Sequence, residues 1–314
     1  MFREFDAANG LHVGVWEPEP DRIPEPDRIP EPVEGASTSS ANRSTETILA
    51  IHGITSSHRA WAPLARQLPD VRIVAPDLRG RGGSRSLPGP YGMARHADDV
   101  AAVLDGLGVG RCVVSGHSMG GYVALTLAHR HPQLVSSLVL VDGGLPLQVD
   151  PTLDPEESLR RTLGPAAERL SRTFASPEEY RAFWRAHPAF AEWTPDIESY
   201  VDYDLVADDG RLHPATAYAA MAADSRDLVT PGNDAAVALR ELAVDATFLR
   251  AERGMVDDPG GLFPADWAAA QVARQPRVDL VEVPGVNHYT ITLGDAGASV
   301  VARAVREALA KTHV

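Results

Sequence analysis

Cysteine is almost absent from this sequence of 314 residues, in which Cys112 is the only one. No disulfide can form within the chain, and a metal cluster held by cysteine thiolates is not expected. Cys112 opens an apolar, strand-like run, a position typical of a small buried side chain and not of a reactive thiol.

Long hydrophobic runs and an excess of positive charge are absent as well. No run approaches the ~18 consecutive apolar residues of a membrane span, and the first residues, Met-Phe-Arg-Glu-Phe-Asp, lack the basic and apolar parts of a signal peptide. The formal net charge of −14 disfavours binding to nucleic acid or to an anionic membrane. We therefore expect a cytoplasmic protein that binds neither, and a homodimer is compatible with the sequence.

What the sequence does contain is a regular alternation of strands and helices. Apolar segments typical of buried strands lie at 47–52, 71–75, 111–116, 137–142, 246–251 and 278–283, and helical segments at 57–68, 93–107, 119–130, 264–274 and 295–311. This order predicts an α/β fold with a mostly parallel, doubly wound sheet covered by helices on both faces. Residues 2–6 and 11–16 flank an Ala-Ala-Asn-Gly turn and predict a hairpin.

Two segments interrupt this pattern. Residues 18–45 begin with two copies of Pro-Glu-Pro-Asp-Arg-Ile and continue rich in Ser, Thr and Asn, which predicts an exposed loop. Residues 143–235 are rich in Pro, Trp, Tyr and acidic residues and look helical and irregular. We interpret them as a cap inserted into a core that comprises residues 1–142 and 236–314.

The strongest chemical signal is Gly-His-Ser-Met-Gly at residues 116–120, which matches the pattern G-x-S-x-G. An apolar strand precedes it and an apolar helix follows, so the chain turns sharply at Ser118. Such a turn exposes a hydroxyl group, and the N-terminus of the following helix favours developing negative charge. Ser118 is therefore the candidate nucleophile, and the backbone N–H of Met119 is a candidate oxyanion donor.

A second oxyanion donor is expected from Ile-His-Gly-Ile at residues 51–54, which closes the first long strand. Gly53 permits a tight bend that would aim the N–H of Ile54 at the site. We interpret His52 as a structural residue that holds this loop.

His288 is the candidate general base. It follows the last apolar strand, at the end of the sheet where open α/β folds place their ligands. A neutral imidazole can accept the serine proton close to neutral pH. Among the eleven histidines, only His288 both follows a strand and lies downstream of Ser118.

Together these residues resemble the α/β-hydrolase superfamily, and the resemblance extends from residue 47 to the end of the chain. The segment Asp-Leu-Arg-Gly-Arg-Gly-Gly-Ser at 77–84 is similar to a structural loop of that family. The resemblance implies a central sheet, a cap over the active site, no cofactor and no metal. It also implies hydrolysis of an ester, lactone, amide or carbon–carbon bond.

The sequence departs from the family pattern at the acid that orients the base. Most relatives carry it after the next-to-last strand, where this sequence has Gly254. Some relatives, including thioesterase domains and fungal zearalenone lactonases, carry it after the strand that follows the helix next to the nucleophile, and here Asp142 occupies that position. We take Asp142 as the acid, because only its contact with His288 is required and chain order is free. The alternatives left open are Asp257, Asp258 and Glu252.

The aromatic residues of the cap suit an apolar or aromatic small-molecule substrate, although an insertion also needs aromatic residues for its own core. We take Trp184 and Trp193 as candidate substrate-binding residues. The leading hypothesis is a hydrolase that cleaves a carboxylic ester or lactone. Carbon–carbon hydrolysis of a diketone-like ring-cleavage product and a non-catalytic ligand receptor on the same fold are the alternatives.

Overall fold

The computed structural model describes residues 1–18, 46–148, 168–208 and 210–312. The proline-rich loop predicted at 18–45 lies, apart from residue 18, outside the described residues. So does part of the predicted cap, residues 149–167. No described helix has the length and apolar character needed to cross a membrane.

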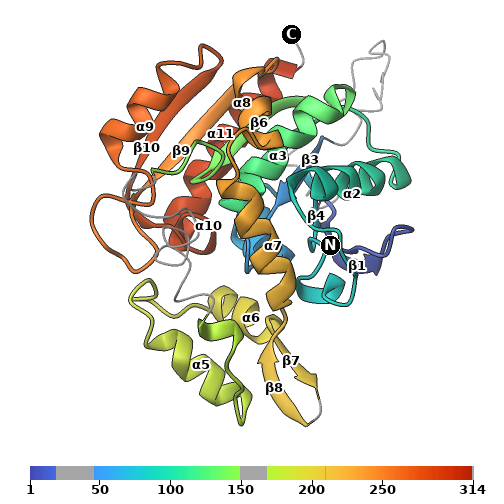
Figure 1. Cartoon of the computed structure of the whole chain (residues 1–314), viewed down its shortest axis with the longest axis vertical. Coiled ribbons are helices and arrows are strands. Elements are labelled where there is room, and N and C mark those ends of the chain that lie inside the picture. Colours follow the sequence, from blue (N-terminus) through green and yellow to red (C-terminus); the bar gives the residue numbers. More distant parts are fainter. Residues whose placement is uncertain (19–45, 149–167, 209, 313–314) are drawn as a thin grey trace, which may run out of the picture.

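Within the described residues, eight strands form one sheet in the order β1-β2-β4-β3-β5-β6-β9-β10 (Figure 1). The strands are β1 (Phe2–Asp6), β2 (His12–Trp16), β3 (Thr47–Ile51), β4 (Arg72–Pro76), β5 (Cys112–His117), β6 (Val135–Val141), β9 (Ala246–Arg253) and β10 (Val278–Asn287). β1 and β2 form the predicted hairpin, and β2 runs antiparallel to β4. All pairs from β4 to β10 are parallel, which confirms the predicted mostly parallel sheet.

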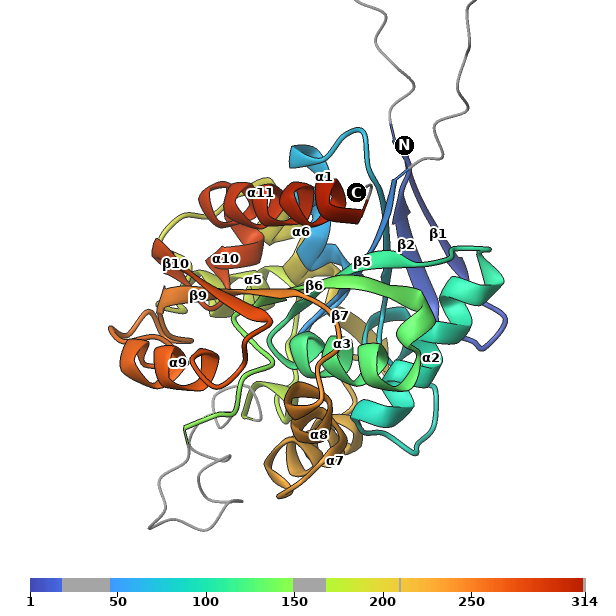
Figure 2. The same ribbon diagram turned by 90° about the horizontal axis from the view of Figure 1, so that it is seen from above.

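Helices cover both faces of this sheet (Figure 2). One face carries α1 (Ala62–Gln67) and α11 (Asp295–Thr312), and the other carries α2 (Met93–Gly106), α3 (Met119–Arg130), α8 (Asp234–Arg240) and α9 (Ala265–Val272). Successive strand residues point to opposite faces of the sheet and pack in two different hydrophobic cores. Ile48 packs in the same cluster as Val305, and Leu49 packs in the same cluster as Val123. Burial on both faces explains why the strands are nearly continuous apolar runs.

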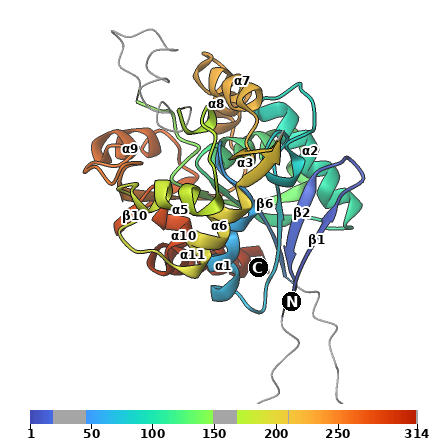
Figure 3. The same cartoon turned by 90° about the horizontal axis from the view of Figure 1, so that it is seen from below.

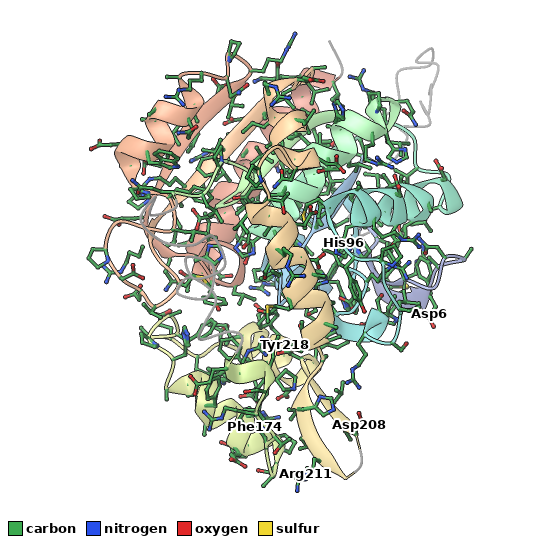
Figure 4. All side chains as sticks on the ribbon, viewed as in Figure 1. Asp6, His96, Phe174, Asp208, Arg211 and Tyr218 are labelled. Carbon is green, nitrogen blue, oxygen red and sulfur yellow. The ribbon has the colours of Figure 1, made fainter. Side chains whose placement is uncertain are left out.

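The described part of the cap lies beyond the carboxyl ends of the parallel strands (Figures 1 and 3). It contains α5 (Pro177–Arg185), α6 (Pro195–Tyr203) and a hairpin of β7 (Leu205–Asp208) and β8 (Arg211–Pro214), after which α7 (Tyr218–Val229) leads back to the core. Figure 4 labels Asp208 and Arg211 at the end of that hairpin. The composition of residues 143–235 predicts helical and irregular structure and does not predict the hairpin, because each of its strands has only four residues. The predicted end of the cap at residue 235 falls inside α8, which packs on α3 of the core.

Candidate active site

Ser118 lies between the end of β5 and the start of α3, in a backbone conformation that few residues other than glycine adopt (φ 54°, ψ −122°). Two flanking glycines permit this turn. A Cβ atom on Gly116 would lie 2.2 Å from the carbonyl oxygen of Gly120, and one on Gly120 would lie 2.1 Å from that of Ile51. The spacing of G-x-S-x-G therefore follows from backbone contact around the serine.

His288 joins Ser118 to Asp142 through its two ring nitrogens. Its Nδ1 lies 2.7 Å from Asp142 Oδ2, and its Nε2 lies 3.1 Å from Ser118 Oγ. A carboxylate can only accept, so Nδ1 carries the proton and Nε2 is left to accept from the hydroxyl group. This is the tautomer that a general base for Ser118 requires.

Asp142 follows β6 and is fully buried, with a positive φ of 45°. Its Oδ1 accepts a hydrogen bond from the backbone N–H of Ala251 at 3.1 Å, and its backbone N–H donates to the carbonyl of Leu249 at 2.8 Å. Both partners lie on β9, so the neighbouring strand fixes the carboxylate while its second oxygen receives His288. The buried carboxylate thus has a partner on each of its two oxygens.

The three alternative acids have other partners. Asp257 pairs with Arg253 at 2.9 Å and accepts from Asn287 Nδ2 at 3.1 Å. Glu252 accepts from the backbone N–H of Gly285 at 2.7 Å. Asp258 Oδ1 lies within 3.4 Å of the N–H of Val256. None of the three contacts His288 in the described structure.

The residues predicted to supply the two oxyanion donors are Met119 and Ile54. Met119 is the first residue of α3, so its N–H has no acceptor within the helix. Ile54 follows β3, and both residues line the pocket that contains Ser118. The chain thus brings both predicted donors to the predicted nucleophile, at the point where β3 and β5 lie side by side in the sheet.

His52 fixes the peptide that carries the N–H of Ile54. Its Nδ1–H donates to the carbonyl of Gly53 at 2.7 Å, and its Nε2 accepts from the N–H of Leu78 at 2.9 Å. Because that carbonyl and the N–H of Ile54 belong to one peptide and point in opposite directions, the bond turns the N–H away from His52. Burial lowers the pKa of His52 to about 4, which keeps the ring neutral. The structural role predicted for His52 is confirmed.

Arg81 also supports the loop that carries Ile54. Sequence reasoning missed this role of Arg81. Its fully buried guanidinium donates from Nε to the carbonyl of Ile54 at 2.9 Å and pairs with Asp224 of α7 at 2.5 Å. Asp224 also contacts His96 Nε2 at 2.9 Å, on α2 beside α7 (Figure 4). The signal that could have indicated this role is the presence of two arginines in the loop at 77–84, to which the sequence assigns only a structural role.

His117 supports the base in a comparable way. Its Nε2–H donates to the carbonyl of His288 at 2.8 Å, so the residue before the nucleophile holds the loop that carries the base. Burial lowers the pKa of His117 well below its ordinary value, which keeps it neutral. The sequence places this residue directly before Ser118 but does not indicate its contact with His288.

The pocket above Ser118 is mainly apolar. Its described lining includes Ile54, Met119, Tyr122, Leu147, Tyr200, Leu228, Met255, Leu262, Tyr289 and Leu293. The described lining contains no arginine or lysine. No group of three or more His, Cys, Asp or Glu side chains in the described residues is arranged to hold a metal ion.

The prediction that Trp184 and Trp193 contact substrate is not supported by their positions. Neither belongs to the described pocket lining. Trp184 is buried in the core of the cap, where its ring lies 5.4 Å from that of Phe190. Trp193 packs against the same core and donates to Glu198 at 2.8 Å. The cap uses both to build its own core, because an inserted segment must bury apolar surface to be stable.

Comparison with known proteins decides the family. Residues 46–186 match the family described as alpha/beta hydrolase fold. A 2-(acetamidomethylene)succinate hydrolase from Mesorhizobium japonicum is 30% identical over 244 residues, which make up 77% of this chain and 81% of that enzyme. The chain belongs to the α/β-hydrolase superfamily.

Two further α/β-hydrolases illustrate the range of the match. Lipase LipV from Mycobacterium tuberculosis is 35% identical over 161 residues, which cover 51% of this chain and a little over half, 58%, of the lipase. The crystal structure of E-2-(acetamidomethylene)succinate hydrolase matches 99% of both chains with a TM-score of 0.74, at 23% identity, and supports the fold alone. As an α/β-hydrolase with these relatives, the chain is a hydrolase.

Proposed function

We propose that this α/β-hydrolase cleaves a carboxylic ester or lactone through an acyl-enzyme. The observation that carries the proposal is the hydrogen-bonded series Ser118–His288–Asp142 beside two backbone donors. Removal of the serine proton by a correctly oriented imidazole is what makes a hydroxyl group nucleophilic.

The reaction has two balanced halves. Ser118 Oγ attacks the substrate carbonyl carbon while its proton passes to His288 Nε2, and the N–H groups of Ile54 and Met119 stabilise the oxyanion. The tetrahedral intermediate then expels the alkoxide, which takes the proton from His288. In the second half, water gives a proton to His288 Nε2 and its oxygen to the acyl carbon, which forms a second tetrahedral intermediate. This intermediate expels Ser118 Oγ, which takes the proton back from His288, so the acid is released and Ser118 and His288 are regenerated.

The pocket favours a neutral, apolar substrate. Its described lining is mostly aliphatic and aromatic and contains no arginine or lysine to pair with a substrate carboxylate. The net charge of −14 also disfavours an anionic substrate. The similarity to a lipase is in line with ester cleavage, whereas a succinate carries two carboxylates, for which these residues offer no partner.

The decisive experiment uses an alkyl fluorophosphonate, which labels activated serines, followed by mass spectrometry and a panel of neutral esters, lactones and 2-(acetamidomethylene)succinate. We expect labelling of Ser118 alone, none in Ser118→Ala, and turnover of neutral esters or lactones. Turnover of the succinate compound in preference to every ester would transfer the assignment to the activity named for the relative. A folded protein with neither label nor turnover would contradict the proposal and favour a ligand receptor.

A further inference from the structure

A second cavity adjoins the pocket above Ser118. Both cavities are lined by the same three side chains, Tyr122, Leu147 and Leu228, so these residues form the boundary between two neighbouring spaces. The second cavity has a volume of about 190 Å³. By the same measure the pocket at Ser118 has about 60 Å³. Ser118 does not belong to the described lining of the second cavity, which is thus the one farther from the nucleophile.

The wall of the second cavity offers an apolar surface. The polar side chains in its described lining are already hydrogen-bonded to the protein. Tyr122 donates to the carbonyl of Leu145 at 2.6 Å, and Thr230 donates to that of Arg226 at 2.8 Å. Asn233 donates to two backbone carbonyls and caps α8 through the N–H of Ala236 at 2.8 Å. No charged side chain belongs to this described lining, so what remains is hydrocarbon from proline, leucine, valine and alanine.

The position of His288 decides which part of a substrate points toward this cavity. The leaving oxygen must lie next to His288, because that ring protonates it. The residues that follow His288, among them Tyr289 and Leu293, line the pocket on the side of α10 (Thr290–Leu293), which packs on α11. Tyr122 and Leu228 come instead from α3 and α7, and Figure 2 shows α3, α7 and α8 on the opposite face of the sheet from α11.

We propose that the second cavity is a subsite for an aliphatic acyl chain, which passes between Leu147 and Leu228 while the leaving group lies on the α10 side. This inference rests on the proposed function and narrows its substrate class to esters of medium-chain fatty acids. Each methylene group moved from water into such a cavity favours binding, so activity is expected to rise with acyl length and not with alcohol length.

Ala236 gives a test that leaves the residues around Ser118 in place. Its exposed side chain on α8 lines the second cavity and does not line the catalytic pocket. We expect the wild-type kcat/KM for the octanoyl ester of p-nitrophenol to exceed that for the acetyl ester at least about tenfold. Ala236→Trp fills the cavity and is expected to reduce this octanoyl-to-acetyl ratio about tenfold. Arg240→Trp, on the same helix but outside the described lining, is the matched control and should keep the ratio.

Two series separate the outcomes. Esters of one alcohol with acids of increasing length should show the effect of Ala236→Trp, and acetates of increasing alcohol length should not. A ratio that Ala236→Trp leaves unchanged, or an effect confined to the acetates, would overturn the subsite. Should Ala236→Trp not fold, the rates at which methyl and octyl fluorophosphonates label wild-type Ser118 answer the same question, and equal rates would overturn the subsite. Failure of Ser118 to be labelled by either reagent would instead count against the proposed function.

Discussion

Replacing one carboxylate oxygen of Asp142 by an amide nitrogen tests the hydrogen-bonded series Ser118–His288–Asp142. Replacing its carboxylate by an amide keeps the volume but allows the side chain to donate, which favours the tautomer of His288 with its proton on Nε2. We expect Asp142→Asn to lower kcat on an ester about 10⁴-fold with little loss of stability. Asp257→Asn is the matched control, because Asp257 contacts Arg253 and Asn287 instead. An unchanged kcat in the first variant and a large loss in the second would transfer the role to Asp257.

The same residues show what the sequence could predict about the site. Ser118 was predictable because its neighbours must be glycines for steric reasons that act within five positions. His288 was predictable from its place after a strand. Asp142 required a family resemblance, since an Asp-Gly-Gly turn has no local mark of catalysis. The contacts of Arg81 and His117 join segments 27 and 171 residues apart in the chain, and no local pattern encodes such distances.

Between elements, Arg81 links the cap helix α7 to the oxyanion loop. Loss of its guanidinium would leave the buried carboxylate of Asp224 without its arginine partner, so we expect Arg81→Met to cost about 3–5 kcal/mol of stability. The double variant with Asp224→Asn should recover part of that stability. In both the single and the double variant, kcat should be about 10- to 100-fold lower than in the wild type, with little change in KM. The reason is that the carbonyl of Ile54 no longer receives the hydrogen bond from Arg81.

Arg79 provides the control for this experiment. It lies in the same loop and is also buried in an ion pair, with Asp99 at 2.8 Å, but it makes no hydrogen bond to Ile54. Denaturant unfolding and ester kinetics of Arg79→Met should show lost stability with kcat retained. Equal losses of kcat in the two arginine variants, or recovery of kcat together with stability in the double variant, would reduce Arg81 to a structural residue.

At the level of the cap, Trp184 and Trp193 belong to its core, whereas Tyr200 of α6 also lines the pocket at Ser118. Trp184 is 3% exposed and packs among Tyr180, Phe183 and Phe190. Trp184→Ala is therefore expected to lower the free energy of unfolding by about 3–5 kcal/mol. Calorimetry detects this as a lower Tm or a separate early transition of the cap. A raised KM with unchanged stability would restore the original interpretation of Trp184 as a substrate contact.

Elements of the core could be predicted more closely than those of the cap. Strands such as β5 and helices such as α3 bury a face against one continuous sheet, so their apolar patterns are long and regular. The cap must form a separate core from short segments. Its hairpin has only four residues in each strand, too few for a periodic pattern to be detected in the sequence. Phe174 pairs with Leu212 of this hairpin from outside it.

For the whole molecule, buried histidines predict how stability varies with pH on the acid side. Burial lowers the pKa of His52 from 6.5 to about 4, while the unfolded chain binds a proton near the ordinary value. The unfolded state therefore holds more protons between these pH values, and stability falls as the pH falls through this window, by about 3 kcal/mol from this group. The lowered pKa of Asp77 adds to the same loss at lower pH. Denaturant titrations between about pH 4 and 7 measure this slope.

His58 has the opposite effect on the pH dependence of stability, because its contribution is lost as the pH rises. This buried ring contacts Asp77 at 2.9 Å and Glu4 at 2.9 Å, and it also faces His12, Arg59 and Tyr203. Burial opposes its charge, but the two carboxylates outweigh burial and raise its pKa. Its contribution is thus complete below about pH 6.5 and is lost as the pH rises through the raised, folded-state pKa.

The His58→Gln variant isolates this contribution. The stability difference between wild type and His58→Gln should be largest near pH 6 and should shrink as the pH rises through the raised pKa of His58, because the wild-type ring then loses the proton shared with Asp77 and Glu4. His129→Gln, at an exposed histidine of α3, is the control and should give a small difference throughout. Since Glu4 lies in β1 and Asp77 follows β4, the proton on His58 joins the hairpin to the core, while Tyr203 of α6 donates to Asp77 from the cap. A difference that does not depend on pH would mean that the proton on His58 contributes nothing to the stability of this contact.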